Sequence, residues 1–208
     1  AGGRGAGLSP GPVSLEVVLG LGGDLATPVL VPLRGGLLVT GPPGSGRTTV
    51  LETLAHGIRA RGWAVQAGPP PASAPRSDTQ QAGSDLAPRT AYLLDDLDVD
   101  LRTDPRLADH LAAVLSGPRP PVLLASCRTV SAASAFRSPL ALLRESCVVV
   151  LSPSSPGSGE VAGTDLSLVT DPVLADHPGR GALVHRGRAL PLQVARESPG
   201  EAAGGARV

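Results

Sequence analysis

The chain has 208 residues, and its 18 basic and 18 acidic side chains give a formal net charge of zero. A chain of this length fits one α/β domain. Its neutral charge gives no whole-domain basic signature, so a non-specific grip on a phosphate backbone would have to come from a local patch. With one Trp, one Tyr and one Phe, its core has to be built from Leu, Val and Ala, which suits a parallel sheet buried between helices.

Membrane-spanning and secretory segments are not expected in this sequence. No apolar run approaches the roughly 20 residues of a membrane-spanning helix and no signal-peptide pattern occurs, so we expect a cytoplasmic segment without direct membrane insertion. The chain does not start with methionine, which indicates a processed product or a piece of a longer protein. Cys127 and Cys147 adjoin predicted buried strands and are interpreted as small core residues, with a disulfide as the alternative.

Glycine and proline dominate both ends of the chain. Residues 1–12 (AGGRGAGLSPGP) are interpreted as a flexible linker and residues 197–208 as a flexible tail, because neither can bury enough apolar surface to order itself. One domain is therefore expected over residues 13–196.

The first half of this domain alternates apolar strands with a helix. Strands are expected in VSLEVVLGLGG, in TPVLVPLRGG and in the apolar run LLVT of residues 37–40. The segment RTTVLETLAHGIRARG carries apolar residues at helical spacing from Arg47 and ends at Gly62, so it predicts a helix. WAVQA follows as a strand, and the polar residues 68–89 are interpreted as a surface excursion or a disordered insert.

The second half continues the alternation. In chain order we expect a strand in TAYLLDD, a helix in PRLADHLAAVLSG, a strand in PVLLASC, a helix in SPLALLRES, a strand in CVVVLS and a closing hairpin in GRGALVHRGRALPLQVA. The hairpin turns at Arg186 and Gly187 and is expected to add an antiparallel edge. Strands that alternate with helices predict right-handed crossovers and a mostly parallel sheet flanked by helices, an α/β fold.

A glycine loop stands between the strand LLVT and the helix that follows it. The sequence GPPGSGRTT, from Gly41 to Thr49, has the spacing of a phosphate-binding loop, although Arg47 occupies the position of the usual lysine. The backbone N–H groups of such a loop and of the helix N-terminus form a cradle for phosphate oxygens. Thr48 would supply a hydroxyl to Mg²⁺. The alternative is a flexible turn in a chain rich in glycine and proline.

Two carboxylates end the strand TAYLLDD. Asp95 is expected to bind the metal and Asp96 to orient or deprotonate the attacking water, because an apolar strand that ends in acid places carboxylates beside bound phosphates. The alternative is a solvated acidic turn, since Asp98 and Asp100 follow in the sequence.

The strand PVLLASC follows the acidic strand. In one large division of ATPases, a strand of this kind lies between the glycine-loop strand and the acidic strand, and its polar end senses the γ-phosphate. Ser126, Cys127 and Arg128 occupy that end here. The alternative is an ordinary exit from a strand into a loop.

Together these segments resemble the FtsK/SpoIIIE-type hexameric motor ATPases, and in particular the later, C-terminal ATPase modules of the EccC-like motor subunit of actinobacterial type VII secretion. The matching segments are LGLGGDLATPVLVPLRGGLLVTGPPGSGRTTVLETLA, YLLDDLD, LLASCRT and PGRGALVHRGRALPLQVA. The resemblance implies a P-loop NTPase fold of the RecA/FtsK-like kind. It also implies that ATP and Mg²⁺ are the cofactors.

The resemblance assigns roles to individual residues. Those expected to bind nucleotide are Gly41, Gly44, Ser45, Gly46, Arg47, Thr48 and Thr49; Thr48 and Asp95 would bind the metal, and Asp96 with Arg47 would serve catalysis. Arg47 in place of lysine and Cys127 in place of a sensor glutamine are similar to the weakly active or inactive modules of the secretion motor. We therefore expect a weak ATPase that binds Mg-ATP with slow or no hydrolysis.

The resemblance also implies partners and two alternative functions. Other ATPase modules of the same chain, or copies in a hexamer, would complete the site with an arginine, for which Arg137 and Arg144 are candidates; the alternative is that both are solvated. A secretion substrate peptide or DNA is the expected cargo, and the parent protein would be anchored in a membrane. The alternatives are a double-stranded DNA translocase motor domain and a catalytically degenerate ATPase fold that docks a signal peptide or a partner subunit.

Overall fold

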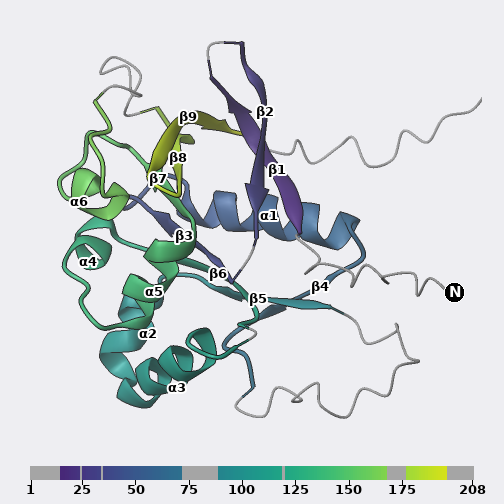
Figure 1. Ribbon diagram of the computed structural model, residues 1–208, viewed down its shortest axis with the longest axis vertical. Helices are drawn as coiled ribbons and strands as arrows, with labels where there is room; N and C mark the ends of the chain where they lie inside the picture. The colour runs from purple at the N-terminus through teal and green to yellow at the C-terminus, as the bar shows by residue number, and fades with distance from the viewer. Residues whose placement is uncertain are drawn as a thin grey trace, which may run out of the picture.

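The structure is a computed structural model that describes residues 15–23, 25–33, 35–71, 89–118, 120–167 and 177–195 (Figure 1). The predicted linker of residues 1–12 and the predicted tail of residues 197–208 lie outside the described residues. So does most of the predicted insert of residues 68–89, of which 72–88 are not described.

Strands and helices alternate through the described residues much as the sequence predicts. The strands are β1 (Glu16–Gly22), β2 (Thr27–Pro32), β3 (Leu37–Thr40), β4 (Ala64–Ala67), β5 (Thr90–Leu94), β6 (Val122–Cys127), β7 (Val148–Leu151), β8 (Arg180–His185) and β9 (Arg188–Val194). The helices are α1 (Arg47–Ala60), α2 (Leu97–Thr103), α3 (Pro105–Leu115), α4 (Thr129–Ala133), α5 (Pro139–Ser146) and α6 (Ser158–Ala162). Only the short helices α2, α4 and α6 were not expected. Among the described residues, no helix has the length and apolar character needed to cross a bilayer.

One sheet contains all nine strands, in the order β2-β1-β9-β8-β7-β3-β6-β5-β4. The five strands from β7 to β4 pair in parallel, and the pairs among the remaining strands are antiparallel. The expected α/β fold is therefore confirmed, with a parallel region that carries the glycine loop. The strand β6 lies between β3 and β5, as expected for a strand whose end adjoins the glycine loop and the acidic residues.

The closing hairpin of β8 and β9 is not at an edge of the sheet, contrary to expectation. β8 pairs with β7, and β9 pairs with β1, so the hairpin joins the parallel region to the antiparallel pair of β1 and β2. The expected turn is correct, because Arg186 and Gly187 connect the two strands with positive φ angles of 51° and 73°. The edge strands are β2 and β4.

The sheet curls around α1 (Figure 1). This helix contacts β1 near one edge of the sheet and β4 at the other. A helix of 14 residues is only about 21 Å long. In a flat sheet the seven strand spacings between β1 and β4 would measure about 34 Å, at about 4.8 Å per spacing. The antiparallel strands therefore fold back over the same helix that the parallel strands cover.

Two apolar cores lie on the two faces of the sheet. On one face, side chains of β1, β3 and β9 pack with α1; on the other, side chains of β3, β6 and β7 pack with α2, α3, α4, α5 and α6. The strand β3 contributes to both, with Leu37 and Val39 in the first core and Leu38 in the second. Burial on both faces fixes the end of β3, from which the glycine loop begins.

Candidate functional site

The glycine loop connects β3 to α1 in a tight curve. Gly46 directly precedes α1 and has φ 96°, a left-handed conformation that L side chains rarely adopt. A Cβ atom on Gly41 would lie 2.3 Å from Ser45 Oγ and 3.0 Å from Leu151 Cβ, so a larger residue there would require its neighbours to move. The left-handed Gly46 and the crowded Gly41 favour the phosphate-loop interpretation over a loose turn.

Polar groups lie in this loop and at the start of α1. The first N–H groups of α1, from Arg47 to Thr49, have no acceptor within the helix and lie at its positive end. Ser45 Oγ and Arg47 Nη1 are buried and have no hydrogen-bond partner among the described residues. Buried polar atoms are normally paired, so these two atoms fit a ligand with acceptor oxygens, such as a phosphate.

The expected metal ligands meet in the structure. The Thr48 hydroxyl, in the first turn of α1, donates a hydrogen bond of 2.7 Å to Asp95 Oδ2, which follows β5. Two adjacent ligands of Mg²⁺ lie about 2.9 Å apart, because Mg²⁺ bonds are about 2.0–2.1 Å long and octahedral. The two oxygens therefore fit a magnesium ion. Within the described residues no group of three or more His, Cys, Asp or Glu side chains could hold a metal.

Ser126 holds the two acidic residues in place from the neighbouring strand. Its hydroxyl donates to Asp95 Oδ1 and accepts a hydrogen bond of 2.9 Å from the backbone N–H of Asp96. Asp96 N–H is also 3.1 Å from Asp95 Oδ1. The Ser126 side chain is fully buried at the end of β6. Ser126 was expected at this end of the strand, but its role in orienting Asp95 was not predicted.

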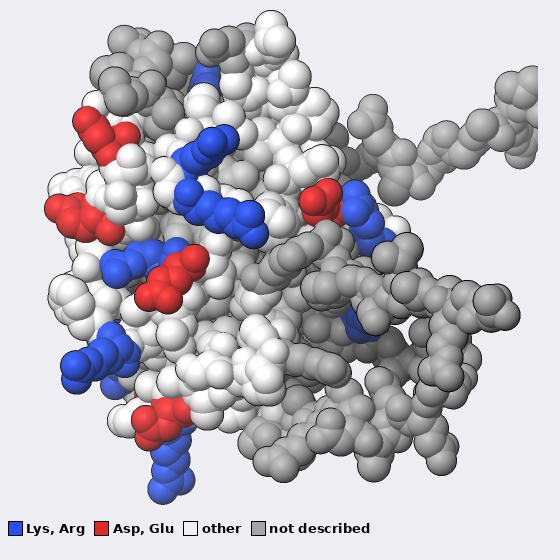
Figure 2. Space-filling model, in the orientation of Figure 1, with Lys and Arg blue, Asp and Glu red and all other residues white. Residues whose placement is uncertain are grey.

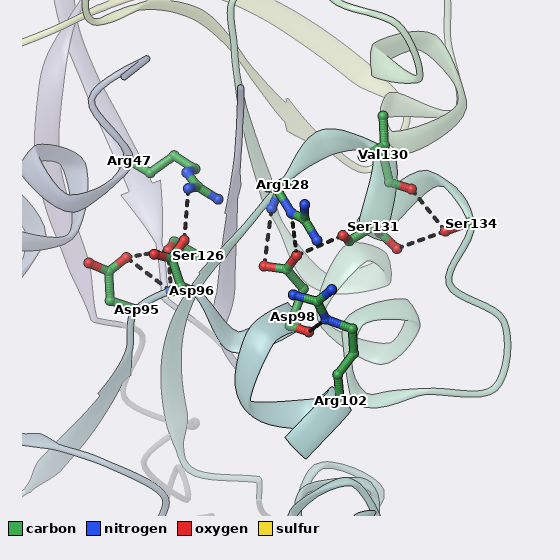
Figure 3. A network of polar contacts seen from close by, with 10 residues as sticks. All are labelled: Arg47, Asp95, Asp96, Asp98, Arg102, Ser126, Arg128, Val130, Ser131 and Ser134. Carbon is green, nitrogen blue, oxygen red and sulfur yellow. Dashed lines mark hydrogen bonds and ion pairs between the residues drawn. The ribbon is translucent and has the colours of Figure 1, made fainter. Parts of the chain in front are cut away.

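The Arg47 side chain forms an ion pair with Asp96. Arg47 Nη2 lies 2.7 Å from Asp96 Oδ1, and the two side chains are 12% and 54% exposed. Asp96 adopts a left-handed backbone conformation with φ 51°, which turns its carboxylate toward α1. The predicted loop cation and the predicted catalytic base therefore neutralise each other in this structure (Figure 3).

A second polar network lies just beyond the end of β6, around Asp98 in α2 (Figure 3). Asp98 Oδ2 accepts hydrogen bonds from Arg128 Nε at 2.8 Å and from Ser131 Oγ at 2.7 Å. Burial raises the pKa of Asp98, but these hydrogen bonds and the Arg128 charge outweigh it and leave the pKa below its usual value. Asp98 is only 4% exposed, so it is a buried, paired acid and not a solvated one.

The sequence offers little signal for this network. Asp98 reads as one of several acids after β5, and its partners lie 30 and 33 residues away. Only the structure shows that the end of β6 and the start of α4 meet α2 at this carboxylate.

Both cysteines lie in the cores and are free, as expected. Burial raises the pKa of the Cys127 thiol to about 12, and burial does the same for Cys147. Neither thiol is poised as a nucleophile at neutral pH.

Three further predicted residues, Thr49, Arg137 and Arg144, lie apart from the acidic pair. Thr49 lies in the first turn of α1, and its carbonyl accepts a hydrogen bond from Thr53 Oγ1. Arg144 Nη1 donates to the carbonyl of Ala132 at 3.1 Å, whereas Arg137 is exposed between α4 and α5. The structure does not bring Arg137 or Arg144 to the glycine loop by any contact among the described residues, so their expected role toward a neighbour stays a prediction.

The fold is similar to that of several solved ATPase structures. The cytoplasmic domain of the Thermomonospora curvata type VII secretion ATPase EccC matches 88% of this chain with a TM-score of 0.65 and 18% identity. ATPases 2 and 3 of EssC from Geobacillus thermodenitrificans match 88% with a TM-score of 0.62 and 13% identity. The pCW3 conjugation coupling protein TcpA, as a monomer with ATPgS, matches 88% with a TM-score of 0.60 and 11% identity.

This chain therefore has the fold of the EccC and EssC ATPase domains, and the expected P-loop fold is confirmed. It spans 26% of the EccC structure, 42% of the EssC structure and 66% of the TcpA structure. No family model and no curated protein sequence matches the chain. At these identities the likeness establishes the fold.

Proposed function

We propose that this chain is the ATP-binding module of an FtsK/SpoIIIE-like motor, which binds Mg-ATP and hydrolyses it slowly or not at all. The observation that carries the proposal is the hydrogen bond of 2.7 Å between Thr48 Oγ1 and Asp95 Oδ2. Thr48 lies in the first turn of α1, directly after the glycine loop. A bound Mg²⁺ would supply positive charge to the β- and γ-phosphates. Thr48 and Asp95 would hold it, and the loop N–H groups would hold the phosphates.

The Arg47–Asp96 pair supports slow turnover. A general base has to turn a carboxylate oxygen toward the attacking water, and Arg47 Nη2 holds one of the two Asp96 oxygens, Oδ1, at 2.7 Å. A guanidinium is also larger than the ammonium for which such loops are usually shaped. Arg47, which would contact the phosphates, would therefore also slow the hydrolysis that follows binding.

The setting within a secretion translocase is supported by the fold comparisons. One matching structure contains ATPases 2 and 3 of Thermomonospora curvata EccC in complex with a signal sequence peptide, and it matches 88% of this chain at a TM-score of 0.61 and 18% identity. We propose that this chain likewise belongs to a longer translocase, in the cytoplasmic part of a membrane-anchored protein, where it contacts other ATPase modules or a substrate peptide. A hexameric assembly remains an expectation from the family resemblance.

The surface gives the alternative of a DNA translocase no comparable support. On the face drawn in Figure 2, the basic and acidic side chains of the described residues are interspersed over a mostly uncharged surface. The whole sequence has a net charge of zero. Proteins bind a phosphate backbone through clustered Lys and Arg. We therefore propose that the cargo is protein rather than DNA.

Mg-ATP should raise the melting temperature of the chain. A ligand that binds only the folded state stabilises it by about 2.7 kcal/mol at one hundred times its Kd. The measurement is a thermal melt with and without ATP and Mg²⁺ at millimolar concentration. Thr48→Ala should reduce the shift, because it removes a metal ligand.

Thr53→Ala is the matched control for this experiment. Thr53 lies on the same helix, and among the described residues its hydroxyl donates to the carbonyls of Thr49 and Ala195 alone. This variant should retain the full ligand-induced shift. A folded wild-type sample that shows no shift at all would contradict the proposed binding of nucleotide.

A further inference from the structure

Ser126 stands beside Asp95 at the ends of two neighbouring parallel strands. The last paired residues of these strands are Leu94 in β5 and Ala125 in β6, and the two polar residues follow them directly. The side chain of Leu124 packs in the same core as α1. Alternate residues of a strand share a face of the sheet, so Ser126 points to the side of α1 as well.

The hydroxyl of Ser126 is fully used by the two acidic residues (Figure 3). It donates to Asp95 Oδ1 and accepts the backbone N–H of Asp96 at 2.9 Å. A hydroxyl has one hydrogen to donate, so Ser126 cannot donate to a phosphate while it holds Asp95. The end of β6 was expected to sense the γ-phosphate, but this hydroxyl is directed to a metal ligand instead.

The two carboxylate oxygens of Asp95 have different partners. Oδ1 accepts hydrogen bonds from the Ser126 hydroxyl and, at 3.1 Å, from the Asp96 N–H. Oδ2 accepts the hydrogen bond of 2.7 Å from Thr48. Because Oδ1 is held from the side of β6, the carboxylate cannot rotate freely, and Oδ2 stays turned toward the first turn of α1.

We infer that Ser126 is a positioning residue for Mg²⁺: it holds Asp95 Oδ1, so that Oδ2 is presented to the metal beside Thr48. The inference rests on the proposed function. Mg²⁺ demands near-ideal octahedral geometry, so the orientation of this carboxylate decides how well the ion is bound. Ser126 acts through Asp95 and contacts neither the metal nor the phosphates.

The test compares ATP binding with and without the metal. Isothermal titration measures the Kd of ATP in excess Mg²⁺ and in EDTA for the wild type and for Ser126→Ala. The variant should bind ATP roughly tenfold more weakly in Mg²⁺, because the loss of a group that orients a metal ligand typically costs 10–100-fold in metal affinity. Its affinity in EDTA should equal that of the wild type, which a general loss of structure would not allow.

Ser126→Cys provides a second variant at the same position. Ser126 is fully buried, and a thiol fills the space of the hydroxyl but is a weaker hydrogen-bond donor and acceptor. This variant should also lose most of the effect of Mg²⁺. A melting curve without ligand checks that each variant is folded, and Ser126→Cys decides the matter if Ser126→Ala is not.

Ser131→Ala is the matched control. Ser131 also donates to an aspartate, Asp98 Oδ2 at 2.7 Å, and Arg128 continues to hold Asp98 when the serine is removed. Among the described residues, Asp98 has no contact with Thr48 or Asp95. The control should therefore keep the wild-type difference between Mg²⁺ and EDTA. An equal loss of this difference in Ser131→Ala would overturn the specific role of Ser126.

The possible outcomes separate this inference from the proposed function. If Mg²⁺ tightens ATP binding to the wild type and to Ser126→Ala equally, the role of Ser126 alone is overturned. A loss of affinity that is equal in Mg²⁺ and in EDTA also overturns it, because Ser126 would then support the loop and not the metal. A wild type that is indifferent to Mg²⁺ overturns the metal site of Thr48 and Asp95, and one that binds no ATP overturns the proposed function itself.

Discussion

At the scale of single residues, the site is defined by pairs that the acids form. Asp95 is held by Ser126 and Thr48, and Asp96 is held by Arg47. The first arrangement leaves the oxygens of Thr48 and Asp95 poised for a cation. The second pairs Asp96 with the Arg47 guanidinium, so under the proposed function Asp96 and a bound phosphate would compete for the same cation.

Asp96→Asn should therefore tighten the binding of Mg-ATP. An exposed ion pair is worth about 0.2–1 kcal/mol, so its removal should lower the Kd by up to about fivefold. Titration calorimetry measures the effect, with Asp100→Asn, an exposed acid on the same helix, as the control.

A second variant shows whether the gain passes through Arg47. Arg47→Ala in the Asp96→Asn background should abolish the gain, because a double-mutant cycle isolates the coupling between the two side chains. A weaker or unchanged affinity of Asp96→Asn for Mg-ATP would show that the pair does not compete with phosphate.

At the scale of elements, two short helices are held together by one buried carboxylate. Asp98 lies in α2, Ser131 lies in α4, and Arg128 stands between β6 and α4. The segments that carry Asp96 and Ser126 are joined to these helices. The Asp98 network therefore helps to hold the segments that carry Asp96 and Ser126 in position.

This network should make stability depend on pH in acid. The folded-state pKa of Asp98 lies below its usual value, so its contribution is complete above the unfolded-state pKa of about 4 and is lost as the pH falls through the lower folded-state pKa. Asp98→Asn should have a lower melting temperature at neutral pH and a smaller decrease between about pH 5 and pH 3. Melting curves across this range measure both effects.

Asp100→Asn again serves as the control, since Asp100 is exposed and should keep the wild-type acid dependence. If Asp98→Asn were as stable as the wild type at neutral pH and lost stability equally in acid, the network would not stabilise the fold in the way described.

At the scale of the whole molecule, α1 joins the two halves of the sheet. Its first turn adjoins the glycine loop, and its later residues pack on β1. The two elements approach closely at Gly57, where a Cβ atom would lie 2.4 Å from Val17 Cγ1. Val17 is 1% exposed and β-branched, so it has no space into which it can move.

Gly57→Ala should destabilise the chain, although alanine is the better helix former. We expect a loss of about 1–3 kcal/mol in the free energy of unfolding, because the added methyl overpacks the core. Urea unfolding measures it. Gly159→Ala in α6 is the control, since its Cβ atom would meet nothing nearer than Thr164 O at 3.7 Å, and it should be neutral or stabilising. Equal effects of the two substitutions would contradict the close packing of α1 on β1.

The sequence was sufficient for the elements whose pattern is local. The apolar run of β3, the helical spacing of α1 and the turn at Arg186 and Gly187 each depend on adjacent residues, and each is confirmed. The helices α2, α4 and α6 have five to seven residues, too few for a periodic pattern to stand out.

The features that the sequence could not supply depend on distant residues. The pairing of β9 with β1 joins segments about 170 positions apart in the sequence, so the hairpin's place inside the sheet was not predictable from its own residues. The contact of Thr48 with Asp95 follows from the expected topology, but the pairing of Arg47 with Asp96 requires the left-handed backbone of Asp96. The sequence of several acids does not reveal which of them turns its carboxylate toward α1.

The helix at the centre of the curled sheet has a mechanical consequence. Arg47 and Gly57 are ten residues apart, so a rigid helix separates them by about 15 Å. Because Gly57 packs closely on Val17 of β1, α1 joins the glycine loop directly to the N-terminal strands. Under the proposed function, a shift of the first turn on nucleotide binding would be carried along α1 to this contact.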